Sequence, residues 1–396
     1  MQEDPIVIVG AARTPMGGFQ GSLTPLSAPE LGGYAIQAAV ERAGVPPEDI
    51  QDLIMGLCLF AGVKQAPARQ AAHLAGIPWD AGATTISKMC GSAMKATMLA
   101  HDNILAGSHD IMVAGGMESM TNAPYILPKA RGGYRLGNGD TVRDHMFMDG
   151  LEDAYDEGRL MGTFAEDTAE HYQFTREAQD NYAIESLTRA KKAVEDGSFD
   201  DEVVPVTVKT RKGETMVTSD EQPFNANMEK IPQLKPAFRK DGTVTPANSS
   251  SISDGAAALV LMKRSEAEKR GLTPKALIHA HSTHSQEPNW FTTAPIGAVK
   301  KVLEKTGWSK EEVDLFEVNE AFAVVAMAAM RDLDIPHDKI NVHGGACALG
   351  HPVGASGARI IVTLMSALEK YNLNKGVASL CIGGGEATAV SIERLN

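Results

Sequence analysis

The sequence predicts an α/β fold built from two duplicated halves, with a long segment inserted in the first half. Short β-branched runs alternate with amphipathic segments, beginning with residues 5–10, 31–43 and 53–56. This alternation is typical of a central sheet covered by helices. One structural unit also occurs twice, and the composition changes between its two copies. Each of these observations predicts part of the architecture.

The repeated unit consists of a glycine turn, an amphipathic helix, a short strand, a Gly-Gly turn and a glutamate. The first copy begins at Cys90-Gly-Ser and ends at Glu118, and the second begins at Gly354 and ends at Glu386. We expect that one α/β half was duplicated. The alternative is that two βα units resemble each other without a common origin.

The segment between the two copies is rich in Gly, Pro, Asp and Arg, and one helix is expected within it at 176–194. We predict a first half of residues 1–120 and 250–271, an inserted loop domain at 121–249, and a second half at 272–396. The apolar run 256–262 is the strand expected to return to the first sheet. Loops that pack on a rigid body often carry substrate contacts, so the insertion is the expected binding region.

Composition excludes several function classes. The 396 residues carry a formal net charge of −13, which argues against nucleic-acid binding because that needs a basic face. The start of the chain is acidic and does not resemble a signal peptide, and the longest apolar stretches are too short to span a bilayer. The four cysteines form no CxxC pair, which argues against a cysteine zinc site or a disulfide framework. We therefore expect a soluble cytoplasmic protein.

Cys90 lies in the turn Lys88-Met-Cys-Gly-Ser-Ala93, directly before an expected helix. A free thiol has a pKa of about 8.5, and the N-terminal end of a helix favours the thiolate. The small residues after Cys90 leave its sulfur and the nearby backbone amides within reach of a ligand. The sequence therefore predicts a reactive thiol with a lowered pKa; the alternative is a small buried side chain.

Three further residues have the chemistry to act with this thiol. His351 lies between Gly350 and Pro352, where the backbone is fixed, and it is a candidate general base. Cys381 precedes three glycines and is either a second acid–base group or the last core residue of a strand. Asn319 lies where a helix is expected to begin, so it either orients a water molecule or caps that helix.

The combined motifs resemble the thiolase family, in particular its acetyl-CoA acetyltransferase type. The resemblance extends over the whole chain and rests on the Cys90 turn and four further motifs: Ile6-Val-Ile-Val-Gly-Ala-Ala-Arg-Thr-Pro15, Val318-Asn-Glu-Ala-Phe-Ala323, Gly350-His-Pro-Val-Gly-Ala-Ser-Gly357 and Cys381-Ile-Gly-Gly-Gly385. It implies the thiolase fold, in which two halves form a five-layered α-β-α-β-α body. It also implies that the insertion at 121–249 binds coenzyme A.

The resemblance implies a role for each catalytic residue. Cys90 would carry the acyl group as a thioester after activation by His351, and Cys381 would take the α-proton of the second acyl-CoA. Asn319 would hold a water that, with His351, forms one oxyanion hole. The backbone amides of Cys90 and Gly383 would form the other. Residues expected to line the acyl-CoA tunnel are Leu151, Met161, Phe238, Ser250, Ala321 and Phe322.

The sequence departs from the family pattern at three places. Leu160 stands where many acetoacetyl-type thiolases have histidine, and Phe291 stands where many have methionine, so both are expected to alter the acyl pocket. The acidic pair beginning at Asp220 lacks the arginine that often follows it and faces the CoA nucleotide. Three basic residues are candidates to replace it or are ordinary surface charges: Lys230, Lys235 and Arg239.

The expected reaction is ping-pong condensation of two acetyl-CoA molecules to acetoacetyl-CoA and CoA, or the reverse thiolysis. The CoA thioester is the substrate, no cofactor or metal is implied, and a homodimer or homotetramer is expected. The close alternative is a broad-range 3-ketoacyl-CoA thiolase of fatty-acid degradation. A decarboxylating ketoacyl synthase is opposed by Asn319 and Cys381. A non-catalytic acyl-CoA- or lipid-binding relative would gain nothing from keeping both cysteines and His351.

Overall fold

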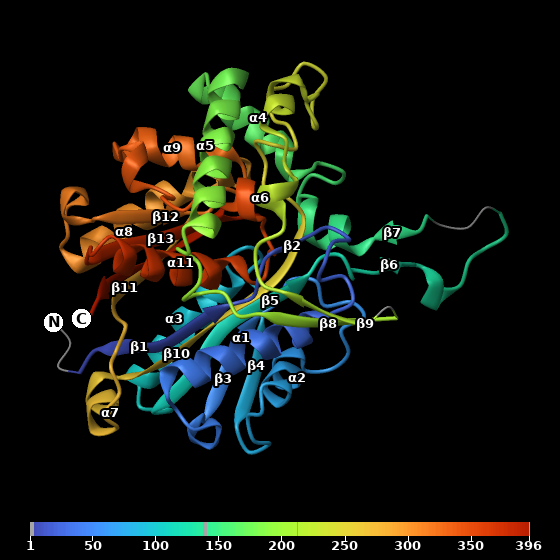
Figure 1. Cartoon of the computed structure of the whole chain (residues 1–396). Helices are drawn as coiled ribbons and strands as arrows, with labels where there is room; N and C mark the ends of the chain where they lie inside the picture. Colours follow the sequence, from blue (N-terminus) through green and yellow to red (C-terminus); the bar gives the residue numbers. More distant parts are fainter. Residues whose placement is uncertain (1–3, 138–140, 212, 396) are drawn as a thin grey trace.

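A mixed sheet of ten strands runs through the molecule, which is described here by a computed structural model covering residues 4–137, 141–211 and 213–395 (Figure 1). Its strand order is β12-β13-β14-β11-β1-β10-β5-β3-β4, with β2 paired to β10. The strands of this sheet are β1 (Ile6–Arg13), β2 (Gly17–Gly18), β3 (Asp52–Gly56), β4 (Gly82–Ile86), β5 (Ile111–Ser119), β10 (Ser253–Lys263), β11 (Ala276–Ser285), β12 (Leu315–Val318), β13 (Lys375–Ile382) and β14 (Glu386–Arg394). Among the residues described, no helix is of a length and apolarity that would carry it across a bilayer.

The sheet consists of one part from each half, and the two parts meet at β1 and β11. These strands pair only at Val7 with Leu277 and at Ile8 with Ala276. The first part contains β4, β3, β5, β10 and β1, and β10 returns from beyond the insertion to pair with both β1 and β5, as predicted. The second part contains β12, β13, β14 and β11.

The order and direction of the elements confirm the duplication. In the first half β3 and β5 are parallel, and β5, β10 and β1 are antiparallel neighbours. In the second half β12 and β13 are parallel, and β13, β14 and β11 are antiparallel neighbours. The counterpart of β4 is a single parallel bridge between Phe316 and Ile340. The residue-level match that the repeated motif suggested is wrong, because Glu118 lies near the end of β5 whereas Glu386 begins β14.

Helices form three layers around the two parts of the sheet, which gives the expected five-layered body (Figure 1). One outer layer packs on the first half, the other packs on the second half, and α3 and α11 lie between them. Nearly every residue of α11 from Ser356 to Leu368 is buried, because a helix between two sheets has no solvent face. The helices of the two halves are α1 (Ala28–Ala43), α2 (Pro67–Leu74), α3 (Ser92–Leu105), α7 (Arg264–Lys269), α8 (Ala294–Thr306), α9 (Ala323–Leu333), α10 (Ala346–Leu349) and α11 (Ser356–Lys370).

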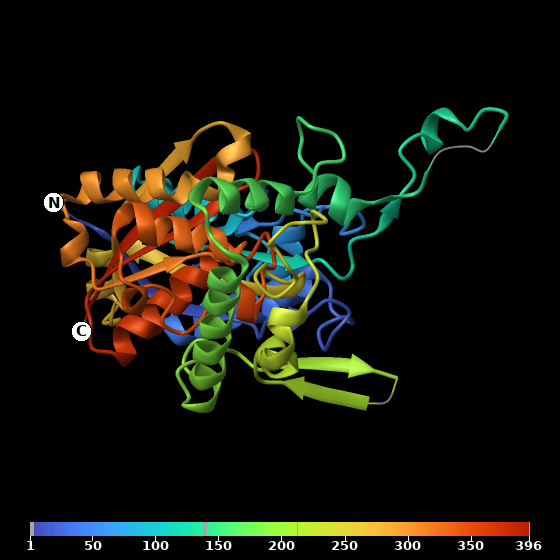
Figure 2. The ribbon, with the colours of Figure 1, turned by 90° about the horizontal axis from the view of Figure 1, so that it is seen from above.

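Residues 121–249 contain more regular structure than the expected loops. The helix predicted at 176–194 is α5, and α4 precedes it. Both pack on the second half, and the β8–β9 hairpin packs on the first. The β6–β7 arm extends away from the body (Figure 2). The elements of this segment are β6 (Tyr125–Ile126), β7 (Arg143–Asp144), α4 (Met161–Tyr172), α5 (Arg176–Glu195), β8 (Val206–Thr210), β9 (Gly213–Val217) and α6 (Gln222–Asn225).

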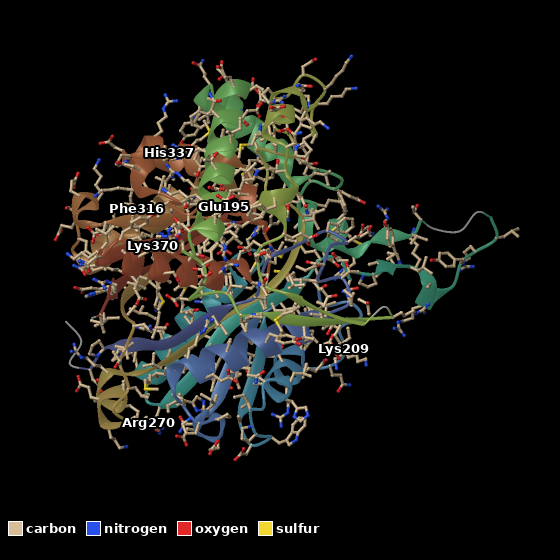
Figure 3. All side chains as sticks on the ribbon, viewed as in Figure 1. Glu195, Lys209, Arg270, Phe316, His337 and Lys370 are labelled. Carbon is tan, nitrogen blue, oxygen red and sulfur yellow. The ribbon has the colours of Figure 1, made fainter. Side chains whose placement is uncertain are left out.

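Most apolar side chains lie in the interior and most charged side chains lie at the surface. Phe316 of β12 is buried inside the second half, whereas Lys209 and Arg270 lie at the periphery (Figure 3). Burial of the apolar faces of both parts of the sheet is the main driving force for this arrangement.

Candidate active site

The turn that carries Cys90 connects β4 to α3 and is held in a strained conformation. Met89 has a φ of 47°, a left-handed value that is rare for a residue with a side chain. The Ser92 hydroxyl accepts the Lys88 backbone N–H at 2.8 Å and donates to Met89 O at 2.6 Å, which closes the turn. Lys88 also pairs with Glu386 of β14 at 2.5 Å. These bonds fix Cys90 at the start of α3 and against the second half.

Cys381 lies in β13 next to the Cys90 turn. A Cβ on Gly91 would overlap the side chain of Ile382, so the two segments meet only because this position has no side chain. The backbone N–H of Gly383 donates to the Cys90 sulfur, and the Cys381 thiol is electrostatically coupled to Cys90. Cys381 is fully buried and Cys90 is half-buried. The structure therefore brings both cysteines and Gly383 together.

His351 is buried, with 7% of its surface exposed, which excludes an exposed turn histidine. Its Nδ1 lies 2.5 Å from the Ser356 hydroxyl, and that hydroxyl donates its proton to Pro352 O at 2.9 Å. Because a hydroxyl has a single proton, Ser356 accepts from His351, and Nδ1 carries the imidazole proton. Nε2 consequently keeps its lone pair and has no hydrogen-bond partner among the described residues. This tautomer is the one a general base needs.

Glu118 joins the His351 turn to the first half, and it had no predicted role beyond the end of the repeated unit. Its buried carboxylate accepts the backbone N–H groups of Cys58 at 3.0 Å, Leu59 at 3.2 Å and Gly354 at 2.8 Å. Burial raises the pKa of Glu118 to about 7. Gly116 of the same strand contacts Gly354 O so closely that a Cβ would overlap it. Glu118 is therefore a positioning residue for the His351 turn.

Asn319 follows β12 and does not cap a helix, since α9 begins only at Ala323. The alternative of a helix cap is therefore excluded, because three more residues extend the chain before the first helical turn. The backbone N–H of Asn319 donates to Ser379 O at 3.0 Å, two residues before Cys381. Arg359 can only donate hydrogen bonds, so its 3.5 Å contact with the Asn319 side chain identifies Oδ1 of Asn319 as the acceptor. The buried Nδ2 has no partner among the described residues.

The residues predicted to line the tunnel fall in two groups around these turns. Leu151 lies in the apolar cluster that also contacts Cys90. Met161 lies beside Gly383, the Phe238 and Phe322 rings meet edge to face with centroids 6.1 Å apart, and Ser250 N donates to Ala321 O at 2.9 Å. The group around Met161 belongs to the cluster that contains Cys381.

Two of the three departures from the family pattern, at Phe291 and at Asp220, have clear surroundings. Phe291 is buried and packs edge to face on Phe164, with ring centroids 5.9 Å apart. Asp220 binds both terminal nitrogens of Arg13, at 2.7 and 2.9 Å, and so faces the protein interior. Arg239 forms an ion pair with Asp167, which neutralises much of the positive charge of the arginine. Lys230 and Lys235 are exposed.

Burial keeps the reactive groups uncharged in the absence of substrate. It raises the pKa of Cys90 to about 11, despite the opposing hydrogen bond from Gly383. It raises the pKa of Cys381 well above its usual range and lowers that of His351 to about 3. The predicted lowering of the Cys90 pKa is therefore wrong, because desolvation outweighs the helix N-terminus. Charge has to be created when substrate arrives.

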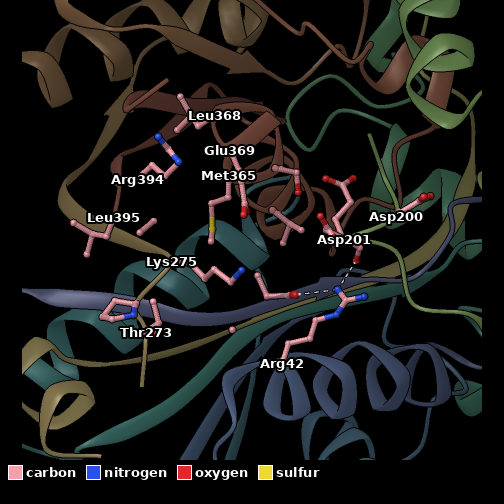
Figure 4. A pocket seen from close by; sticks show the side chains of 17 residues that line it. Arg42, Asp200, Asp201, Thr273, Lys275, Met365, Leu368, Glu369, Arg394 and Leu395 are labelled. Atoms are coloured by element: carbon pink, nitrogen blue, oxygen red, sulfur yellow. Dashed lines mark hydrogen bonds between the residues drawn. The ribbon is translucent and has the colours of Figure 1, made fainter. Parts of the chain in front are cut away.

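A separate cavity of about 660 Å³ lies between the halves and contains none of these residues (Figure 4). It opens where the edge of β1 is left unpaired, and Arg42 donates there to Ala11 O at 3.1 Å and Glu202 O at 3.0 Å. Lys275 and Asp201 lie on its walls (Figure 4). It is distinct from the cysteine site.

Comparison with known proteins identifies close relatives over the whole chain. The family described as thiolase, N-terminal domain, matches residues 6–265, and that described as thiolase, C-terminal domain, matches residues 272–394. An acetyl-CoA acetyltransferase of Cupriavidus necator is 47% identical over 98% of this chain and 99% of its own. A cytosolic acetyl-CoA acetyltransferase of mouse is 48% identical over 99% and 98%. The crystal structure of the Bacillus anthracis acetyl-CoA acetyltransferase superposes with a TM-score of 0.96 and 43% identity, covering 99% of each chain.

Proposed function

This chain belongs to the thiolase family, and we propose that it is an acetyl-CoA C-acetyltransferase that joins two acetyl-CoA molecules into acetoacetyl-CoA and CoA, or runs the reverse thiolysis. The observation that carries the proposal is that the Cys90 turn packs against the Cys381 strand and against the turn of His351, whose Val353 shares an apolar cluster with Cys90. The buried Nε2 of His351 is unprotonated and unpaired. A non-catalytic binding protein has no use for that arrangement.

In the first half-reaction, Nε2 of His351 takes the Cys90 thiol proton while the sulfur attacks the thioester carbonyl. The tetrahedral intermediate collapses, and the C–S bond to CoA breaks. Cys381 gives its proton to the departing CoA sulfur, which leaves Cys381 as a thiolate beside a protonated His351. The acetyl group then remains on Cys90 as a thioester.

In the second half-reaction, the Cys381 thiolate removes the α-proton of a second acetyl-CoA. The resulting enolate carbon attacks the acetyl carbonyl on Cys90. When this second tetrahedral intermediate collapses, the Cys90 sulfur leaves and recovers its proton from His351. Cys381 keeps the α-proton, so both cysteines return to the thiol form and His351 to the neutral form. Two thiols are needed because one is occupied when the α-proton must be removed.

Each half-reaction places negative charge on an oxygen, and separate donors are available for the two sites. The backbone N–H groups of Cys90 and Gly383 face the Cys90 sulfur and suit the tetrahedral oxyanion. The unpaired Nδ2 of Asn319, through a water, and the protonated His351 suit the enolate of the second substrate. Loss of one such donor typically costs about 10²–10³ in rate.

We further propose that no metal or redox cofactor takes part, because acid–base chemistry and nucleophilic sulfur supply every step above. A cytoplasmic location agrees with the cytosolic mouse relative. A homodimer or homotetramer is favoured by two exposed features. One is the edge strand β4, and the other is the β6–β7 arm, in which Tyr125 and Leu136 are 69% and 107% exposed.

Thiolysis of a 3-ketoacyl-CoA series from about four to twelve carbons tests the acetyl assignment against the broad-range alternative. Phe291 and Phe322 are buried near Cys381 and are expected to limit acyl length. A steep fall in kcat/KM beyond the four-carbon substrate is the expected result. A flat or rising profile would contradict the acetyl assignment, since each methylene in an open apolar channel adds about 1–3 kcal/mol.

A further inference from the structure

Two histidines and an aspartate lie close together outside the catalytic site. His101 and Asp102 belong to α3, and His281 belongs to β11. One carboxylate oxygen of Asp102 lies 3.0 Å from His101 Nδ1 and 2.8 Å from His281 Nε2. The three potential ligand atoms all lie within 4.8 Å of one another, a spacing found in no other His, Cys, Asp and Glu group of the described chain.

A β-bulge in β11 makes this cluster possible. The register with β14 shifts between Ile278 and Ala280. Ile278 points into the layer between the two parts of the sheet, whereas His279 turns to the opposite side and packs against Trp308 with ring centroids 4.8 Å apart. Regular alternation would put His281 on the side of His279, but the extra residue returns it to the inner side, facing Asp102.

The cluster has the donor set and access of a transition-metal site. Two imidazoles and a carboxylate are typical Zn²⁺ ligands, and a tetrahedral ion with bonds of about 2.0–2.1 Å separates its ligand atoms by about 3.4 Å. The two separations from Asp102, 2.8 and 3.0 Å, are a few tenths of an ångström shorter, and the two histidine nitrogens lie within 4.8 Å of each other, so an ion would be enclosed after rotation of these side chains.

The burial of His101 and the solvent exposure of Asp102 agree with a metal site. The Asp102 side chain is 51% exposed and opens the cluster to solvent, whereas His101 is 4% exposed and keeps an unpaired Nε2. A shift of the imidazole proton of His101 from Nδ1 to Nε2 frees Nδ1 to bind a metal. The remaining position on the ion would be taken by water.

We propose that His101, Asp102 and His281 bind one divalent transition-metal ion of the Zn²⁺ type, which clamps the first half of the molecule to the second. The ion is structural. His101 lies nine residues into α3 from its start beside Cys90, which places it about 14 Å along the helix axis from the catalytic turn.

Zinc titration of the whole protein against a chromophoric chelator tests the site. The cysteines are first alkylated, so that thiolates cannot bind the ion. The parent should bind one equivalent. Loss of a residue that only supports a metal ligand typically weakens binding by about 10- to 100-fold. His281→Gln removes a proposed ligand, so it should weaken zinc binding by more than this. His279→Gln, on the same strand but facing Trp308, is the matched control and should bind as the parent does.

A second measurement guards against a variant that folds poorly. Asp102→Asn keeps the size of the side chain and an oxygen acceptor but removes the charge, and it should also weaken zinc binding. Zinc should raise the unfolding temperature of the parent and of His279→Gln but not of His281→Gln or Asp102→Asn. Equal zinc affinity in the parent and His281→Gln, or no binding by the alkylated parent, would overturn the proposal.

Discussion

Ser356→Ala tests the proposed base most directly. The Ser356 hydroxyl donates to Pro352 O and therefore accepts the Nδ1 proton of His351. Alanine leaves this buried donor unpaired, which costs about 1–3 kcal/mol. The tautomer with its proton on Nε2 also carries an unpaired buried donor, so alanine removes the preference for the Nδ1 tautomer, and the Nε2 tautomer cannot accept the Cys90 proton. Loss of about 1–3 kcal/mol changes the ratio of the two tautomers by about 5- to 150-fold, which brings them toward equal populations and lowers the competent fraction by about twofold.

The assay is rapid-quench measurement of acyl-enzyme formation from radiolabelled acetyl-CoA, well below the unfolding temperature. The acylation rate constant should fall by at least about twofold, because the imidazolium formed in this step also loses its acceptor. KM should stay within about twofold, because Ser356 acts on the base and not on substrate affinity. Ser366→Ala is the matched control, since Ser366 lies in the same helix but lines the separate cavity. Acylation of Ser356→Ala at the parent rate would refute the tautomer argument.

Three further predictions concern single residues. Cys90→Ala should abolish the labelled acyl-enzyme, and a normal yield of labelled protein would show that another residue is the nucleophile. Cys381→Ala should still acylate at Cys90 but fail to form acetoacetyl-CoA, so condensation at the parent rate would assign the α-proton elsewhere. Glu118 has its pKa raised from 4.5 to about 7, so the folded state binds more protons between these values and loses about 3 kcal/mol of stability as pH rises through the window. Urea unfolding measured between pH 4.5 and about 7 should therefore show that the stability of Glu118→Gln rises relative to that of the parent as the pH rises. A difference in unfolding free energy that stays constant across this range would contradict the raised pKa of Glu118.

The sequence predicted the elements whose signals are local. The β-branched run at the start of the chain is β1, and the glycine turn at Cys90 leads into α3. The alternation of strands and helices also predicted the central sheet covered by helices, and the repeated unit predicted the duplication of the two halves. α4 was not predicted, since its apolar residues are interrupted by charged ones and form its buried face only against the second half.

Features that depend on distant contacts could not be predicted. The sign of the Cys90 pKa shift depends on burial under the second half, which no local motif encodes. The function of Glu118 depends on three backbone N–H groups from two remote loops. The orientation of His281 depends on a one-residue bulge, and such a register shift leaves no sequence signature here.

The duplication explains why the catalytic groups lie together and why the two halves differ there. α3 and α11 are equivalent helices in the shared central layer, so the turns before them, which carry Cys90 and His351, meet. Gly116 of β5 pairs with the last residue of β3, and Ser379 of β13 pairs with the last residue of β12. Glu118 and Cys381 each lie two residues further along, at equivalent positions. One half therefore uses this position for a carboxylate that holds the loops in place, and the other uses it for the thiol assigned to proton transfer. A single strand-end geometry thus supplies both the support and the proposed acid–base group.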